Sequence, residues 1–120
     1  MTIVIKKERP PKLPGFTHQM KTGCGTLYVT INEVDSEIFE IFVTMGKAGG
    51  CASAQIEAIG RLISLALRSG VSIDQIIKQL GGISCHSPVG THDNKISSCA
   101  DAVSKAIKNH LNAIPVIKEK

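Results

Sequence analysis

Apolar and polar side chains alternate in two stretches of the first half of the chain. From Thr26 to Ile31 every second residue is Leu, Val or Ile, and the run from Ile38 to Thr44 repeats this alternation. A period of two is typical of a half-buried β-strand. The polar segment 32–37 between the two runs is short enough for a hairpin turn. We therefore predict two antiparallel strands, the second with Phe39, Ile41 and Val43 on its core face.

The spacing of apolar residues changes to that of a helix after residue 50. Apolar residues at helical spacing from Ala52 to Ala66 predict the principal helix, which should continue to Gly70, where a helix C-cap requires a positive φ. The segment Ser72-Ile73-Asp74-Gln75 has the spacing of a capping box and predicts a second helix toward Leu80. Gly81-Gly82 should end this helix.

The last third of the chain begins with a segment that has no periodicity. Residues 83–98 are rich in Pro, Gly, Thr, Asp and Asn, so we predict a loop there. A third helix should start near Cys99, because apolar residues again recur at helical spacing. Its inward residues are expected to be Val103, Ala106, Ile107, Leu111 and Ile114.

These elements predict an α+β fold, in which a two- or three-stranded antiparallel hairpin sheet packs against about three helices. The prolines of the segment Arg9–Gly15 cannot join a hydrogen-bonded ladder or helix, so this segment should run extended. We place an extended basic arm at residues 1–21 and a single domain at residues 22–120. A chain of 120 residues is long enough for one core.

The net charge of +4 belongs to the arm. Residues 1–21 carry five basic side chains and one acidic side chain, whereas the rest of the chain is balanced. The arm could meet an acidic partner surface, but it has no aromatic residues interleaved with its charges, so we expect no specific nucleic-acid binding. There is neither a secretory signal nor an apolar run of about 18 residues. We expect a soluble cytoplasmic protein without membrane contact.

The four cysteines all fall at the boundaries of predicted elements. Cys24 precedes the first strand, Cys51 opens the main helix, Cys85 follows the second helix and Cys99 opens the third. Three of them lie close to glycines, which let the backbone approach an ion. Four thiols match the tetrahedral set that zinc prefers, and an iron–sulfur cluster accepts the same ligands. Without a C-x-x-C pair, spacing also leaves open reduced structural cysteines, a redox or nucleophilic pair, and disulfides.

The histidines and Asp101 leave further alternatives. His86 and His92 lie in the long loop, and either could replace a cysteine ligand. We expect His18 and His110 to be ordinary surface or boundary residues. Asp101, three residues after Ser98, should support the first turn of the third helix rather than bind metal. The glycine-rich segment 46–50 has neither a Walker pattern nor G-x-G-x-x-G, and it resembles a phosphate-binding loop only loosely.

Four segments, in order along the chain, resemble the TSCPD domain. They are TGCGTLYVT at Thr22–Thr30, GKAGGC at Gly46–Cys51, RLISLALRSGV at Arg61–Val71 and SSCADA at Ser97–Ala102. The last is similar to the motif that names the family, with Ser97 in place of Thr and Ala100 in place of Pro. That domain lies toward the C-terminus of adenosylcobalamin-dependent (class II) ribonucleotide reductases and also occurs as short stand-alone proteins.

This resemblance implies a metal-binding accessory domain, related to ribonucleoside-diphosphate reductase, that has no complete catalytic site. The reductase needs a large barrel with a radical-forming cysteine and cobalamin, for which 120 residues give no room. We therefore expect adenosylcobalamin only in multidomain relatives, and no catalytic residue here. A reductase catalytic subunit, met through the arm, is the implied partner, and a homo-oligomer is compatible with the sequence.

A weaker resemblance is to the iron–sulfur cluster scaffold fold. In that fold a cysteine precedes a hairpin, a Gly-Cys opens the long helix and a third cysteine opens a late helix. Here these positions are Cys24, Cys51 and Cys99. The resemblance implies that they converge on one site, with Cys85 as the natural fourth ligand. We therefore predict a zinc site formed by Cys24, Cys51, Cys85 and Cys99, with a cluster scaffold or thiol-exchange protein as the alternative.

Overall fold

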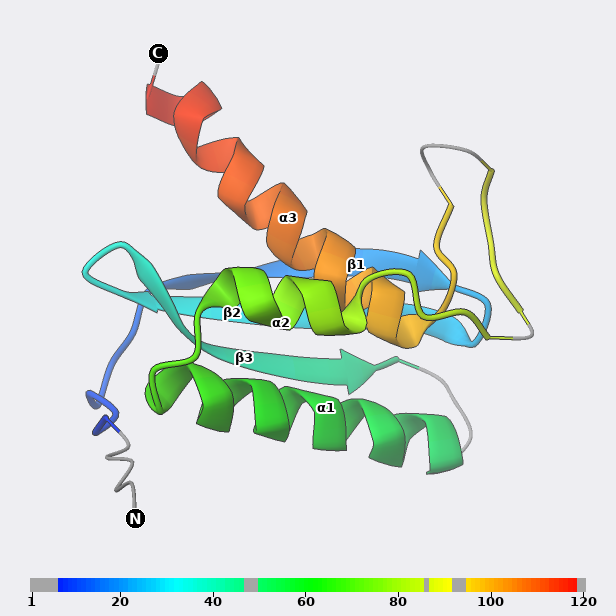
Figure 1. Cartoon of the computed structure of the whole chain (residues 1–120), viewed down its shortest axis with the longest axis horizontal. Coiled ribbons are helices and arrows are strands. Elements are labelled where there is room, and N and C mark those ends of the chain that lie inside the picture. Colours follow the sequence, from blue (N-terminus) through cyan, green and yellow to red (C-terminus); the bar gives the residue numbers. More distant parts are fainter. Residues whose placement is uncertain (1–6, 47–49, 86, 92–94, 119–120) are drawn as a thin grey trace.

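In a computed structural model, residues 7–46, 50–85, 87–91 and 95–118 are described, with the backbone alone at 50–51 and 113–118. The chain forms three strands followed by three helices: β1 (Gly15–Thr22), β2 (Gly25–Val34), β3 (Glu37–Met45), α1 (Gly50–Arg68), α2 (Ile73–Leu80) and α3 (Cys99–Lys118). The strands form one antiparallel sheet in the order β1-β2-β3 (Figure 1). The predicted α+β fold is confirmed. None of the described helices combines the length and apolar character that crossing a bilayer requires.

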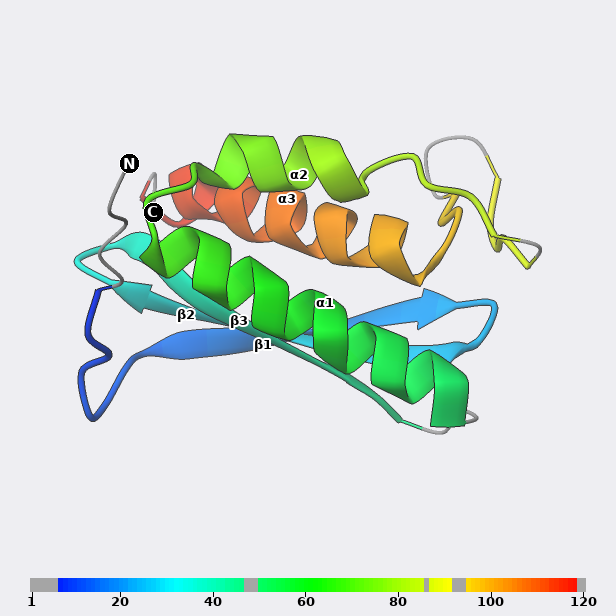
Figure 2. The ribbon, with the colours of Figure 1, turned by 60° about the horizontal axis from the view of Figure 1, so that its bottom comes forward.

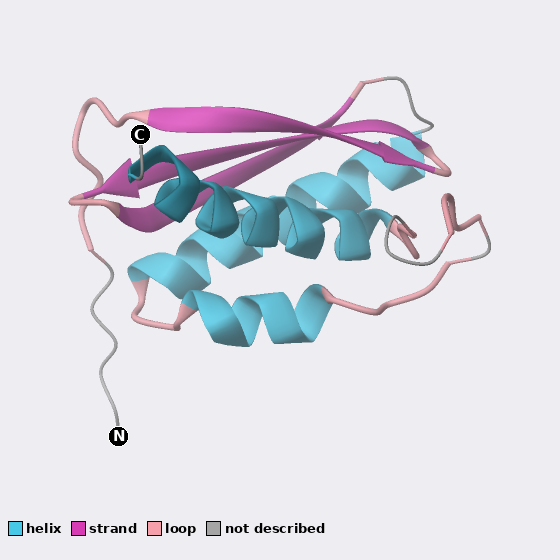
Figure 3. Cartoon of the chain, turned by 90° about the horizontal axis from the view of Figure 1, so that it is seen from above, coloured by secondary structure: helices cyan, strands magenta, loops and turns pink. Residues whose placement is uncertain are grey.

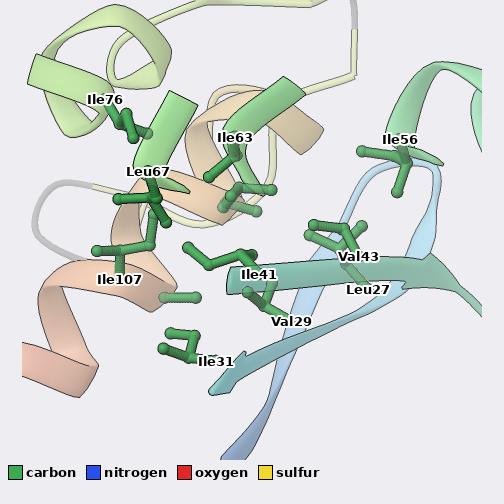
Figure 4. Close-up of a cluster of buried hydrophobic side chains, with 13 residues drawn as sticks. Leu27, Val29, Ile31, Ile41, Val43, Ile56, Ile63, Leu67, Ile76 and Ile107 are labelled. Carbon is green, nitrogen blue, oxygen red and sulfur yellow. The ribbon is translucent and has the colours of Figure 1, made fainter. Parts of the chain in front are cut away.

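The three helices lie on one face of the sheet, so the fold has two layers (Figures 2 and 3). Alternate residues of β2 point into the space between the layers, where Leu27, Val29 and Ile31 are fully buried. Their neighbours along the strand face the open side of the sheet. The core consists of Leu27, Val29, Ile31, Ile41, Val43, Ile56, Ile63, Leu67, Ile76, Ala102, Val103, Ala106 and Ile107 (Figure 4).

The predicted inward faces are confirmed within the described residues. Phe39, Ile41 and Val43 are buried in β3. Val103, Ala106 and Ile107 are fully buried in α3, and Leu111 packs against the core, whereas the side chain of Ile114 lies outside the described part.

The ends of the helices follow their predicted signals. Ser72 caps α2 and its hydroxyl accepts a hydrogen bond from the Gln75 backbone N–H at 3.4 Å. Gly70, two residues after the end of α1, has a φ of +100°, a backbone conformation that residues with a side chain rarely adopt. Helix α2 ends at Leu80, directly before Gly81-Gly82, and α3 begins at Cys99.

Strand β1 is not predicted from the sequence, which indicates an extended arm at residues 15–21. It pairs with β2 along its whole length. Phe16, His18 and Met20 lie on the face of the sheet that carries the helices, because they are opposite Ile31, Val29 and Leu27. Only two of these three side chains are apolar, and the strand lies at the edge of the sheet, so the period of two is weak in the sequence.

Helix α1 lies along the free edge of β3 (Figure 1). The Ser64 hydroxyl donates to the Ile41 carbonyl at 2.8 Å and accepts from the Ile41 N–H at 3.0 Å. A Cβ at Gly60 would stand 3.2 Å from the Val43 nitrogen, so glycine allows this close approach. The helix thereby satisfies edge groups that could otherwise pair with another chain.

The residues before β1 are attached to the domain by a buried carboxylate. Glu40 is 2% exposed, and Arg9 donates to both of its oxygens, from Nε and from Nη2, at 2.9 Å. Asn32 donates to the same carboxylate at 2.7 Å. Burial alone would raise the pKa of Glu40, but these hydrogen bonds and the charges of Arg9 and Arg68 outweigh it, so the pKa is lowered. The basic arm is therefore partly neutralised by the fold.

His110 is buried, so the expectation of an ordinary surface or boundary residue is wrong for this histidine. It is 4% exposed and lies between two polar partners. Its Nε2 is 2.6 Å from Glu33 Oε2 on β2, and its Nδ1 is 3.1 Å from Nε2 of His18 on β1. Because a carboxylate oxygen accepts, Nε2 of His110 is the donor to Glu33, which leaves its Nδ1 to accept from His18. This chain of hydrogen bonds attaches α3 to both strands.

The histidine pair should make stability depend on pH. Burial and the neighbouring His110 lower the pKa of His18, so the unfolded chain binds a proton there more readily than the folded chain. The stabilisation is present above the unfolded pKa of about 6.5 and is lost as the pH falls below it. In His18→Gln, which cannot titrate, we expect the free energy of unfolding, measured in urea, to fall less steeply between about pH 7 and pH 5.

A matched control is Thr17→Val, in the same strand but on the opposite face, where the Thr17 hydroxyl contacts that of Thr30 at 2.8 Å. This variant should lose stability equally at every pH in that range. Parallel pH profiles for the wild type and His18→Gln would contradict the role given to the pair.

Candidate functional site

Three segments that carry cysteines meet at one end of the fold. Cys24 lies in the turn between β1 and β2, Cys85 lies in the segment after α2, and Cys99 is the first residue of α3. Figure 1 shows this turn, the segment and the start of α3 together at the end of the sheet opposite the N-terminus. No disulfide joins these three cysteines, which are all free thiols.

The Thr22 hydroxyl connects the turn to α3. It accepts a hydrogen bond from the Cys24 N–H at 3.1 Å and one from the Cys99 thiol at 3.6 Å, and it donates to the Gly25 carbonyl at 2.8 Å. A hydroxyl has one donor and two acceptor positions, so these contacts use its full capacity. The sequence does not predict this role, and the one signal for it is the position of Thr22 at the start of the segment TGCG.

The segment that carries Cys85 packs against the same turn. A Cβ at Gly23 would stand 1.8 Å from the Ser87 carbonyl oxygen, which no real side chain could do. Only glycine therefore allows the turn to approach Ser87 this closely. The Ser87 N–H donates to the Cys85 sulfur at 3.4 Å, which fixes the thiol near the contact.

The predicted loop is more regular than its composition indicated. The Cys85 N–H donates to the Ser97 carbonyl at 2.9 Å, and Val89 and Ile96 form a β-bridge with two hydrogen bonds of 3.0 and 2.8 Å. The far end of the loop therefore comes back beside its beginning, so that Cys85 lies close to the residues that precede α3. Composition alone could not predict this, because backbone groups make these bonds.

Cys99 and Cys85 lie close enough to Cys24 to change the pKa of its thiol. The adjacent Cys99 thiol, with burial and the more distant Cys85, raises the pKa of the Cys24 thiol. The physical cause is repulsion between like charges, since two thiolates side by side are unfavourable without a cation. Cys24 is itself exposed to solvent. A bound cation would reverse this shift and favour the thiolates.

Asp101 holds both ends of the loop. It is 1% exposed, and its Oδ1 accepts from the Gly82 N–H at 2.9 Å while its Oδ2 accepts from the Ser97 N–H at 2.9 Å. Lys105, one turn later, also pairs with Oδ2. Burial alone would raise the pKa of Asp101, but these hydrogen bonds and the Lys105 charge outweigh it and the pKa is lowered.

The start of α3 is capped as predicted. The Ser98 hydroxyl accepts from the Asp101 N–H at 3.0 Å, which is the N-cap bond. The expectation that Asp101 supports the first turn of this helix is confirmed, and its side chain also fixes the residues before Cys99 and after α2.

The structure thus brings three of the four predicted ligands to one end of the fold. The side chain of Cys51 lies outside the described residues, as do His86 and His92. Among the side chains that are described, no three His, Cys, Asp or Glu residues are arranged to hold one metal ion. The prediction of a shared four-cysteine site therefore stays a prediction.

Comparison with known proteins gives one match. The model of the TSCPD domain matches residues 3–111, which is most of the chain. No curated protein and no solved structure matches the chain. The match includes the residues of all four cysteines and of Asp101.

Replacing Asp101 should loosen the thiol end of the fold. In Asp101→Asn the new amide NH2 faces a backbone N–H that has lost its acceptor, and the ion pair with Lys105 is lost. We expect a loss of about 2 kcal/mol of stability, the cost of a buried donor left without a partner. Asp74→Asn removes the same charge from the exposed first turn of α2 and should cost less than about 1 kcal/mol. Equal losses for the two variants in urea unfolding would show that Asp101 has no such role.

Proposed function

We propose that this chain, which belongs to the TSCPD domain family, is an accessory domain that binds a zinc ion through its cysteines. The observation that carries the proposal is the gathering of Cys24, Cys85 and Cys99 from three separate segments. The Thr22 hydroxyl contacts the Cys24 backbone and the Cys99 thiol, and Cys99 has the largest influence on the pKa of Cys24. Cysteines that only fill the core would not gather at one end of the fold, and none of them would be exposed as Cys24 is.

The donor set suits a soft metal ion. Thiolates are the preferred ligands of zinc, and a structural zinc site uses four ligands without catalytic water. Cys99 is the first residue of α3, and the N-terminus of a helix attracts negative charge. Cys24, Cys85 and Cys99 would hold the ion, and Cys51 is the fourth ligand we propose. The ion would connect the β1–β2 turn to α3 and the loop.

A cluster scaffold or thiol-exchange protein is the second candidate. The exposure of Cys24 beside the Cys99 thiol favours it, because an exchanging thiol must be reached by a partner. The raised pKa of Cys24 argues against a reactive thiolate in the metal-free protein. An iron–sulfur cluster accepts the same four thiolates, so visible absorbance after anaerobic purification would favour the scaffold.

We also propose that the domain docks on the catalytic subunit of an adenosylcobalamin-dependent ribonucleotide reductase. The support is the family, together with the position of the arm. Arg9 is engaged with Glu40, whereas Lys12 is exposed and follows the tethered part of the chain. A basic exposed segment suits an acidic surface of a partner.

Metal content tests the zinc proposal. We expect protein purified without added metal to contain one zinc ion per chain by elemental analysis, and each Cys→Ser variant at positions 24, 51, 85 and 99 to lose most of it. Ser64→Ala is a control that should keep its zinc, because Ser64 bonds to the edge of β3 at Ile41 and not to a cysteine. Unchanged zinc in Cys85→Ser would assign the fourth position to His86 or His92, and unchanged zinc in Cys24→Ser and Cys99→Ser would refute the site.

Docking is tested with the purified reductase of the same organism. We expect the chain to bind it with a dissociation constant that rises at higher salt, because rim charges act through screened attraction. Lys12→Glu should weaken binding by about tenfold or more, whereas Lys78→Glu on α2 should have little effect. Equal binding by both variants would exclude the arm as the docking segment.

A further inference from the structure

Folding brings three arginines from distant parts of the chain to one pocket. The pocket has a volume of about 260 Å³ and lies between α1 and β3, with Arg9, Arg61 and Arg68 in its walls. In Figure 1 the segment before β1 passes the C-terminal end of α1, which explains how Arg9 reaches the helix. The sequence gives no sign of this cluster, since Arg9 is separated from the other two by more than 50 residues.

Two of the guanidinium groups are held in place by the protein. Arg9 is fixed on the buried carboxylate of Glu40. Arg68 donates from Nε and Nη2 to the Lys7 carbonyl at 3.0 and 2.8 Å, and its guanidinium carbon lies 5.3 Å from the centre of the Phe39 ring. A ligand would not have to order these side chains, which removes part of the cost of binding.

The positive charge in the pocket exceeds the negative charge. Among the described residues that line the pocket, Glu40 is the one carboxylate, and Arg9 already pairs with it. Within the described part of the chain, Arg68 forms no ion pair, and its Nη1 makes no hydrogen bond. Arg61 pairs with Glu57, but both side chains are more than 60% exposed, so this pair contributes little. Arg68 and Arg61 are therefore available to an anion.

The same pocket exposes apolar surface. Phe42 is 51% exposed and Leu65 is 49% exposed, and both line the pocket beside the arginines. An inorganic anion would leave this surface in contact with water. A ligand that combines an anionic group with a flat ring would cover it and gain from the burial.

We propose that this pocket binds a small phosphorylated molecule that carries a ring, such as a mononucleotide. The planar guanidinium fork of arginine matches the geometry of phosphate oxygens, and it does so better than lysine. Arg68 and Arg61 contact the phosphate, and Phe42 contacts the ring. The site lies on α1 and β3 and shares no residue with the thiol end of the fold, so it is independent of metal binding.

Calorimetric or NMR titration at constant ionic strength tests the site, with adenosine 5′-monophosphate as the probe. We expect it to bind at least about tenfold more tightly than inorganic phosphate, because the ring adds burial on Phe42. Adenosine, which lacks the phosphate, should bind about tenfold more weakly than the monophosphate, and benzoate, which offers a ring and a carboxylate, should also bind less tightly.

Variants connect binding to the pocket. Arg68→Gln and Arg61→Gln should each weaken binding of the monophosphate by about tenfold, whereas Lys78→Gln, an equal loss of charge on α2, should not. The Lys7 carbonyl accepts its hydrogen bonds from Arg68, whereas Arg61 bonds to Glu57, so the Arg61 variant separates anion binding from attachment of the arm. Binding that is no tighter than to inorganic phosphate, or that is equal in Arg61→Gln, Arg68→Gln and Lys78→Gln, would overturn the proposal.

Discussion

The buried carboxylate of Asp101 is the constraint on which the thiol end of this protein depends. One side chain accepts hydrogen bonds from Gly82, just after α2, and from Ser97, just before α3. The loop between these residues carries Cys85, and Cys99 follows directly. A single charged group therefore fixes where the loop leaves and where it returns. The positions of Cys85 and Cys99 depend on this closed loop. The close approach of Gly23 to Ser87 then places the β1–β2 turn, which carries Cys24, against the loop.

Much of the fold could be predicted because the two layers bury residues with clear periods. The alternation from Leu27 to Ile31 and the helical spacing in α1 and α3 each indicate which face of the element packs against the core. Strand β1 could not be predicted in the same way, since it lies at the sheet edge and turns His18 inward. A polar residue on the inner face hides the period, and its partner, His110, is 92 residues away in the chain.

The candidate site could be predicted in its residue types but not in its geometry. Cysteines at element boundaries pointed to a shared site, and the structure places Cys24, Cys85 and Cys99 at one end. Contacts between segments bring them there. These are the contacts of the Thr22 hydroxyl, the close packing of Gly23 and the backbone hydrogen bond from Cys85 to Ser97. No local pattern specifies such contacts, because each depends on two segments that meet only after folding.

The central claim is that thiols from separate segments share one metal ion. X-ray absorption at the zinc edge, on protein purified without added metal, tests it most directly. We expect a coordination shell of sulfur at about 2.3 Å, with at most one nitrogen in place of a sulfur. A shell of nitrogen and oxygen alone, or protein that contains no zinc, would contradict it.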